Sequence, residues 1–204
     1  MTAMPRPLTR RAAAIFVSAG VLAALATTFT GCSEPAPLVP KGAWSLVFVD
    51  TGPGCQIAGH NVSIGEITAD KRQTLVKDQN VEGNVTTTVV CSVVDNGGSF
   101  YFDAAESNSA GNVLTLIVPE ISTSATKDSP AKGTVSYMSP NTATTFSSTD
   151  CNFYFIDGTG QGAKAGSIWL TFECPSISAA SDNVCQIQIA YAAFEQCVSE
   201  AEEG

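Results

Sequence analysis

The stretch TTVVCSVV (Thr87–Val94), DNGG (Asp95–Gly98) and SFYFDA (Ser99–Ala104) decides the fold. Its first and third parts are short and rich in β-branched and aromatic residues, which favour strands. The middle part combines Asp, Asn and two glycines, the residues that tolerate the backbone angles of a tight turn. Thr87–Ala104 is therefore predicted to form a β-hairpin.

Similar segments flank this hairpin on both sides and are separated by turn residues. They predict further strands at Trp44–Val49, Val62–Thr68, Val113–Val118, Gly133–Met138, Asn152–Ile156 and Gly166–Cys174. The stretch from Cys185 to Val198 fits either a strand or a helical stripe, and its alternation of apolar residues with Gln186 and Gln188 favours the strand. Eight or nine strands without alternating long helices predict one all-β domain, a β-sandwich or a barrel-like fold, over Lys41–Cys197.

The beginning of the chain has the three parts of an export signal. Basic residues at positions 6, 10 and 11 precede a mostly apolar, uncharged run, which ends at Gly31-Cys32. This order is typical of a signal peptide, and the small residue before Cys32 resembles the lipobox of bacterial lipoproteins. The resemblance implies cleavage after residue 31 and a lipid on Cys32. An uncleaved membrane anchor of about 20 residues and ordinary secretion are the alternatives.

The parity of the cysteines agrees with that interpretation. The chain has seven cysteines, so lipid modification of Cys32 leaves an even number. Since the export signal indicates an oxidising compartment, these six are expected to form three disulfides: Cys55, Cys91, Cys151, Cys174, Cys185 and Cys197. Their spacing is too wide for a zinc site, and we expect neither a metal nor a cofactor.

The segments on either side of the predicted domain differ from it in composition. Residues 32–40 contain Cys32 and a run with three prolines, Ser33–Pro40, which favours an extended spacer. Residues 198–204 carry three glutamates and are expected to be a frayed acidic tail. Three of the ten basic residues precede Cys32 and all 19 acidic residues follow it, which leaves a mature charge of −12. This charge argues against a nucleic-acid partner and predicts repulsion from anionic lipid headgroups. No later stretch is long and apolar enough to span a bilayer.

Part of the chain resembles the mycobacterial lipoprotein-antigen family. The resemblance rests on Val76–Gly83 leading into Val89-Val90-Cys91, on Trp169–Cys174, and on the glycine-rich turn Gly158–Gly162. It implies a surface-displayed β domain without established enzymatic activity, and it implies that Cys91 pairs with Cys174.

Geometry adds one exclusion to the disulfide pairing. Cys185 and Cys197 are twelve residues apart, about 40 Å along a strand or about 18 Å along a helix. A disulfide needs Cα atoms within about 7 Å, and no turn residue lies between these two cysteines. They are therefore not expected to bond to each other. Taken with the pair that the resemblance implies, Cys55 and Cys151 remain to pair with Cys185 and Cys197, in an order that stays open.

The residues that could carry chemistry are few. His60 is the only histidine, and Ser63 lies in a stretch that lacks the first glycine of a nucleophile elbow. We interpret His60 as a turn residue that bonds a local backbone group. Asp157–Gly162 lacks the ligands of a calcium loop and is predicted to be a turn. The strand aromatics Tyr101, Tyr137, Tyr154 and Trp169 are expected in the core.

These observations favour a non-enzymatic lipoprotein of the bacterial envelope, lipid-anchored and extracytoplasmic, with a binding or structural β domain. No catalytic residue is assigned, and the protein or glycan partner stays open. Two alternatives remain: a hydrolase that uses two carboxylates, and a barrel that carries an apolar ligand. A cleft lined by two acids would favour the first, and a large internal apolar cavity would favour the second.

Overall fold

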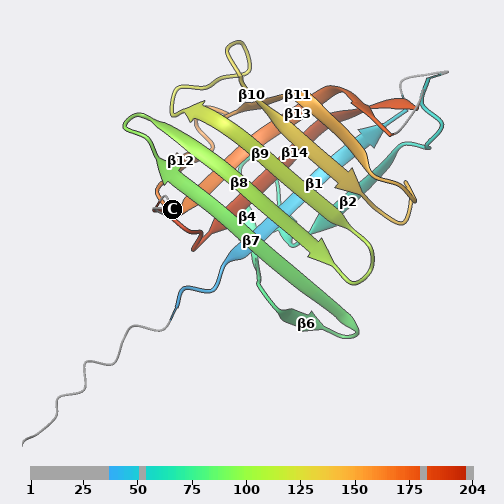
Figure 1. Ribbon diagram of the computed structural model, residues 1–204, viewed down its shortest axis with the longest axis horizontal. Helices are drawn as coiled ribbons and strands as arrows, with labels where there is room; N and C mark the ends of the chain where they lie inside the picture. Colours follow the sequence, from blue (N-terminus) through green and yellow to red (C-terminus); the bar gives the residue numbers. More distant parts are fainter. Residues whose placement is uncertain (1–36, 51–53, 180–182, 201–204) are drawn as a thin grey trace, which may run out of the picture. The chain divides into compact units, whose positions relative to one another are not determined.

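A computed structural model describes residues 37–50, 54–179 and 183–200 (Figure 1). Within these ranges the fold is all-β and contains no helix. The strands are β1 (Lys41–Val49), β2 (His60–Ile64), β3 (Glu66–Ile67), β4 (Arg72–Thr74), β5 (Val76–Lys77), β6 (Asn80–Glu82), β7 (Val85–Asp95), β8 (Ser99–Asn108), β9 (Val113–Ser122), β10 (Ala131–Met138), β11 (Phe146–Tyr154), β12 (Gly162–Lys164), β13 (Ser167–Ser178) and β14 (Val184–Glu195).

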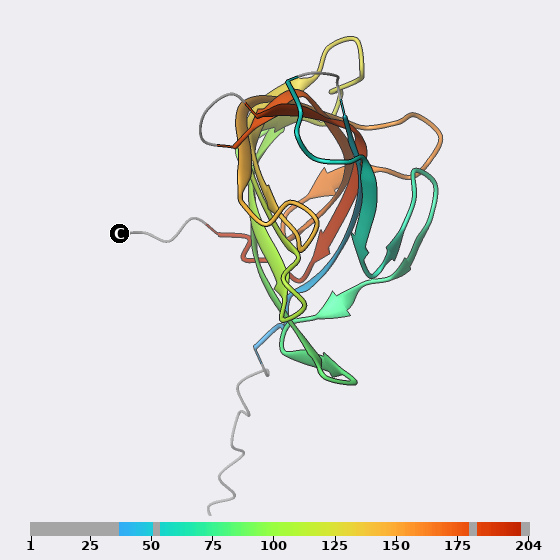
Figure 2. The ribbon, with the colours of Figure 1, turned by 90° about the vertical axis from the view of Figure 1, so that its right-hand side faces the viewer.

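Twelve of these strands form one antiparallel sheet, and β3 pairs with β4 in a small second sheet. The order in the large sheet is β2-β1-β14-β13-β11-β10-β9-β8-β7-β6, with β5 paired to β1 and β12 paired to β13. The large sheet curls into a half-barrel, so that β7–β10 face β1, β13 and β14 across the core (Figures 1 and 2). The prediction of an all-β sandwich or barrel-like domain is confirmed.

Beyond its short pairing with β6, the edge of β7 lies against the ends of the opposite wall. Asp78, just after β5, accepts a hydrogen bond from Val89 N through its carboxylate (2.8 Å). Farther along β7, Val93 N donates to Val198 O (2.8 Å), and Val93 O accepts from Gly166 N (2.9 Å). These contacts tie β7 to segments that adjoin β1, β13 and β14, and they satisfy backbone groups that an edge strand would otherwise expose.

The structure has more strands than the eight or nine predicted. The additional ones are short: β4, β5, β6 and β12 have two or three residues each, below the length at which a period-two pattern is visible. The predicted strand Val62–Thr68 is divided into β2 and β3 at Gly65, which has a positive φ of 70°. The C-terminal segment is the strand β14, as the alternation favoured.

The core fills the space inside the curled sheet. Alternate residues of each long strand point inward, and the largest fully buried side chains are mostly aromatic: Trp44, Tyr137, Phe48, Phe102, Phe146, Phe153, Phe172 and Phe194. The rings of Phe153 and Phe172 stack at 5.4 Å between centroids. Burial of these aromatic side chains between the two walls of the sheet stabilises the fold.

All six cysteines of the domain form disulfides: Cys55–Cys185, Cys91–Cys197 and Cys151–Cys174. The exclusion of a Cys185–Cys197 bond is confirmed, and Cys55 takes one of its two predicted partners. The prediction that Cys91 pairs with Cys174 is wrong, because Cys91 bonds Cys197. The prediction that Cys151 bonds Cys185 or Cys197 is also wrong, because Cys151 bonds Cys174.

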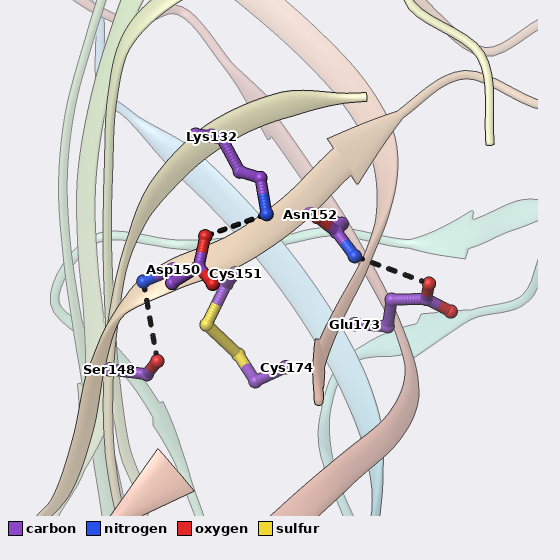
Figure 3. A network of polar contacts seen from close by, with 7 residues as sticks. All are labelled: Lys132, Ser148, Asp150, Cys151, Asn152, Glu173 and Cys174. Carbon is purple, nitrogen blue, oxygen red and sulfur yellow. Dashed lines mark hydrogen bonds and ion pairs between the residues drawn. A yellow bond between two sulfur atoms is a disulfide. The ribbon is translucent and has the colours of Figure 1, made fainter. Parts of the chain in front are cut away.

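Strand pairing gives the physical reason for the Cys151–Cys174 bond. β11 and β13 are neighbours, and Asn152 lies opposite Glu173 in their register. Cys151 and Cys174 therefore face each other, with Cα atoms 4.3 Å apart. Figure 3 shows the bond beside the Lys132–Asp150 ion pair (2.6 Å) and the hydrogen bond from Asn152 to Glu173 (3.5 Å).

Several predictions concern segments at the two ends. The signal peptide at 1–31, Cys32 and most of the spacer lie outside the described residues, as do positions 201–204. Val198 is not frayed as expected, because its N–H donates to Cys91 O (3.0 Å) and it bridges to Ser92 of β7. The described residues contain no helix long and apolar enough to cross a membrane.

Candidate functional site

A largely apolar groove with a volume of about 790 Å³ lies on the outer face of the β7–β8 hairpin. Three cross-strand pairs that point away from the core form its floor: Val90 with Ala105, Ser92 with Asp103, and Val94 with Tyr101. Its wall is made by Val198 and Glu200, which follow β14, and Asn96 lines it from the hairpin turn. We call this hollow the outer groove. Its volume is in the range of small-molecule sites in proteins.

The wall of the outer groove depends on a local reversal and on a disulfide. Gln196 adopts a positive φ of 58° directly after β14, which turns the chain toward β7. Cys197 then bonds Cys91 with a Cα–Cα distance of 4.9 Å. The hydrogen bonds of Val198 to β7 complete the attachment. A covalent bond and two backbone hydrogen bonds therefore fix the wall to the floor.

The apolar side chains of the outer groove are unusually exposed for a sheet surface. Val90 is 63% exposed and Val198 is 53% exposed. The apolar surface continues onto β9, where Ile117 lies opposite Asp103 and is 36% exposed. Outward positions of a half-buried sheet are normally polar, and a contiguous exposed apolar patch is typical of an interaction site.

The charged groups that line the outer groove are the carboxylates of Asp103 and Glu200. The hydroxyl of Tyr101 donates to Asp103 Oδ2 at 3.5 Å. Burial raises the pKa of Tyr101, and the neighbouring charge of Asp103 raises it further. The groove thus combines apolar side chains with two carboxylates, Asp103 on its floor and Glu200 on its wall, an arrangement that favours a ligand with a positive group.

Glu106 is a buried carboxyl that the sequence analysis did not identify. It continues the inward series Phe100, Phe102 and Ala104 on β8 and is 0% exposed. Neither of its oxygens has a hydrogen-bond partner within the part of the chain that the structure describes. Burial therefore raises the pKa of Glu106 from 4.5 to about 9, so the group is uncharged at neutral pH.

The position of Glu106 depends on the glycine opposite it. A Cβ atom on Gly42 of β1 would lie 2.5 Å from Glu106 Oε2 and 2.8 Å from Phe194 Cε1. The carboxyl thus uses the space that any other residue at position 42 would fill. Extending the period-two pattern of Ser99–Ala104 by two residues would have placed Glu106 on the buried face. The predicted strand ended too early.

The structure brings His60 together with Tyr137 and Ser139, and keeps it away from Ser63. His60 Nδ1 donates to Ala58 O (2.9 Å), which leaves Nε2 to accept from the Tyr137 hydroxyl (2.9 Å), with Ser139 Oγ at 3.5 Å. The contact to Ala58 confirms a local backbone partner, but His60 begins β2 and is not a turn residue. Ser63 is three positions farther on the same strand, so it points to the opposite, exposed face.

The Asp157–Gly162 segment leads from β11 to the first residue of β12, with Gly158 and Gly160 at positive φ. Gln161 fixes the turn, because its side chain accepts from Ile156 N (3.1 Å) and donates to Ala69 O (2.9 Å). The predicted turn is confirmed. Among the described residues, no three His, Cys, Asp or Glu side chains are grouped so that they could hold a metal ion.

The four strand aromatics divide into two groups. Tyr137, Tyr154 and Trp169 are buried, as predicted. The prediction is wrong for Tyr101, which is partly exposed on the outward face of β8 and lines the outer groove. Its neighbours Phe100 and Phe102 take the inward positions, and a strand can turn only every second side chain to the core.

Comparison with known proteins adds no further assignment. No family model, no curated protein and no solved structure matches this chain.

Proposed function

We propose that this protein is a non-enzymatic lipoprotein of the bacterial envelope, anchored by a lipid on Cys32, whose β domain binds a ligand in the outer groove. The three disulfides support an oxidising, extracytoplasmic setting. The observation that carries the binding function is the outer groove itself, where the exposed Val90 occupies an outward position of β7 and the exposed Val198 lies on a covalently fixed wall.

The chemistry of the outer groove selects an apolar ligand with a positive charge. Val90, Val94 and Ala105 offer apolar surface that such a ligand would remove from water. Asp103 and Glu200 would face its cationic group. We assign the ligand to the outer groove and not to the inside of the half-barrel, because large aromatic side chains fill that interior.

Mass spectrometry of the membrane-extracted protein tests the anchor. The expected N-terminal peptide begins at Cys32 and carries the mass of a lipid, and a Cys32→Ser variant should be lost from the membrane fraction. An unmodified N-terminus that retains residues 1–31 would refute the anchor.

Fluorescence titration with two apolar dyes of opposite charge tests the groove. The cationic dye thioflavin T is expected to bind, and the anionic dye anilinonaphthalene sulfonate is expected to bind more weakly. Val90→Lys should abolish binding of the cationic dye, because it places a positive charge on the groove floor. Val184→Lys is the matched control, since Val184 is an exposed valine, 39% accessible, on β14 outside the groove. Equal loss in both variants, or preference for the anionic dye, would refute the proposal.

A further inference from the structure

Four of the seven basic residues that follow Cys32 gather at one end of the fold. Lys41 begins β1, where it pairs with Lys77 of β5 on one side and with Glu195 of β14 on the other. Arg72 contacts Glu195 at 2.6 Å, and Lys164 lines the same surface hollow as Arg72 and Glu195. The seven basic residues are outnumbered by 19 acidic ones in the same part of the chain, so this end of the fold differs from the overall charge of −12 after residue 31.

Exposed apolar side chains lie at the same end. Leu38 is 69% exposed and lines the hollow that contains Arg72 and Lys164, and the adjacent Val39 is 46% exposed. Val81 of β6 is 63% exposed. It is three residues after Asp78, whose N–H donates to Pro40 O (2.8 Å) and so holds this segment beside the start of the domain. Figures 1 and 2 both show the β6 hairpin at the end where the chain enters β1.

The acids of this end are partly engaged by protein groups. The carboxylate of Asp78 accepts from Val89 N, and that of Glu195 pairs with Arg72. Glu82, next to Val81, and Glu200, next to Ser199 of the hollow that contains Arg72, are exposed. We define the basal face as the set that combines exposed apolar and basic side chains: Leu38, Val39, Lys41, Arg72, Lys77, Val81 and Lys164.

The length of chain between the proposed anchor and the domain limits how far the basal face can be from a membrane. Pro37 is five residues after Cys32, and an extended chain covers at most about 3.6 Å per residue. A lipid on Cys32 would therefore hold Pro37 within about 18 Å of the lipid surface, whatever conformation the intervening residues adopt.

We propose that the basal face docks on an anionic phospholipid surface, with Leu38, Val39 and Val81 in the interface and the basic side chains near the headgroups. This inference rests on the proposed lipid anchor and adds an orientation to it. Lysine and arginine beside exposed apolar residues are what a peripheral membrane contact requires. The end of the fold that carries Val184 then points away from the bilayer, since β14 extends about 36 Å from Glu195 to Val184.

Quenching by brominated lipids measures this orientation in the full-length, lipidated protein. Val81→Trp and Val184→Trp place reporter indoles at the two ends, and the native Trp44 and Trp169 are buried and supply the background. In vesicles of phosphatidylcholine and phosphatidylglycerol, Val81→Trp is expected to lose about half of its added emission, because interfacial side chains reach the acyl boundary. Val184→Trp should keep its emission.

Charge reversal tests the contribution of the basic residues. In the Val81→Trp background, Lys41→Glu with Lys77→Glu should remove most of the quenching. The matched double variant Lys127→Glu with Lys132→Glu should keep the quenching, because these two lysines are not part of the basal face. They pair with Glu173 of β13 and Asp150 of β11. The same quenching in vesicles of phosphatidylcholine alone would overturn the anionic preference.

Flotation of the same samples separates the two proposals. If the protein floats with the vesicles but Val81→Trp is quenched no more than Val184→Trp, the docking proposal is overturned and the anchor stands. If the protein neither carries the lipid mass nor floats, the proposed anchor fails and the docking inference fails with it.

Discussion

Replacing Glu106 with Gln should stabilise the protein at neutral pH and should change little at acid pH. The amide keeps the size of the carboxyl, so packing against Phe194 and Gly42 is retained. What changes is the proton equilibrium. The unfolded chain has a pKa of 4.5 at this position, and burial raises the pKa of Glu106 in the folded chain to about 9.

The sign and size of the effect follow from these two pKa values. Between pH 4.5 and about 9 the folded state keeps a proton on Glu106 that the unfolded state releases, so the free energy of unfolding falls as the pH rises. The contribution of the protonated Glu106 to the free energy of unfolding is fully present below pH 4.5 and is lost as the pH rises toward 9. Each pH unit corresponds to about 1.4 kcal/mol, which gives about 3 kcal/mol at pH 7.

Urea unfolding at several pH values, with disulfides intact and tryptophan fluorescence as the signal, measures this difference. We expect Glu106→Gln to exceed the wild type by about 3 kcal/mol at pH 7 and to match it within about 1 kcal/mol at pH 4.5. Glu120→Gln, an exposed carboxyl on β9, is the control and should change neither value. A stability difference between Glu106→Gln and the wild type that does not vary with pH would refute the reasoning.

Three further predictions concern the same fold. Gly42→Ala should lower the free energy of unfolding by about 1–3 kcal/mol in urea titrations, since the added methyl meets Glu106 Oε2 at 2.5 Å; no loss would mean that the carboxyl can move aside. The double replacement of Cys91 and Cys197 by Ser opens a loop of 106 residues and should cost about 5 kcal/mol in calorimetry. The same variant should weaken thioflavin T binding, and unchanged binding would show that the disulfide does not form the groove wall. His60→Ala should cost about 1–2 kcal/mol in thermal denaturation through its lost hydrogen bonds but leave dye binding intact, and a loss of function at unchanged stability would revive a catalytic role.

Local pattern made much of the architecture predictable. The hairpin Thr87–Ala104 occurs as β7 and β8 because its alternation and its Asp-Asn-Gly-Gly turn are properties of adjacent residues. The strand at the C-terminal end follows from the same period-two alternation. The residues of the candidate site were harder to predict from the sequence. The aromatic Tyr101 faces outward and the acidic Glu106 faces inward, the opposite of what their polarity suggests. The register of β8 decides which side chains face inward.

The sequence by itself determined the strand-rich fold class and the even number of cysteines in the domain, since both are carried by composition and by spacing within short segments. The tertiary structure alone decided which cysteines meet, because disulfide partners are chosen by Cα distances across the sheet and Cys151 lies opposite Cys174 only once β11 and β13 are neighbours. It also decided where the outer groove and the basal face lie. Each brings together residues that are far apart in the chain, and their proximity follows from the curling of the sheet and from the contacts of β7 with the ends of the opposite wall.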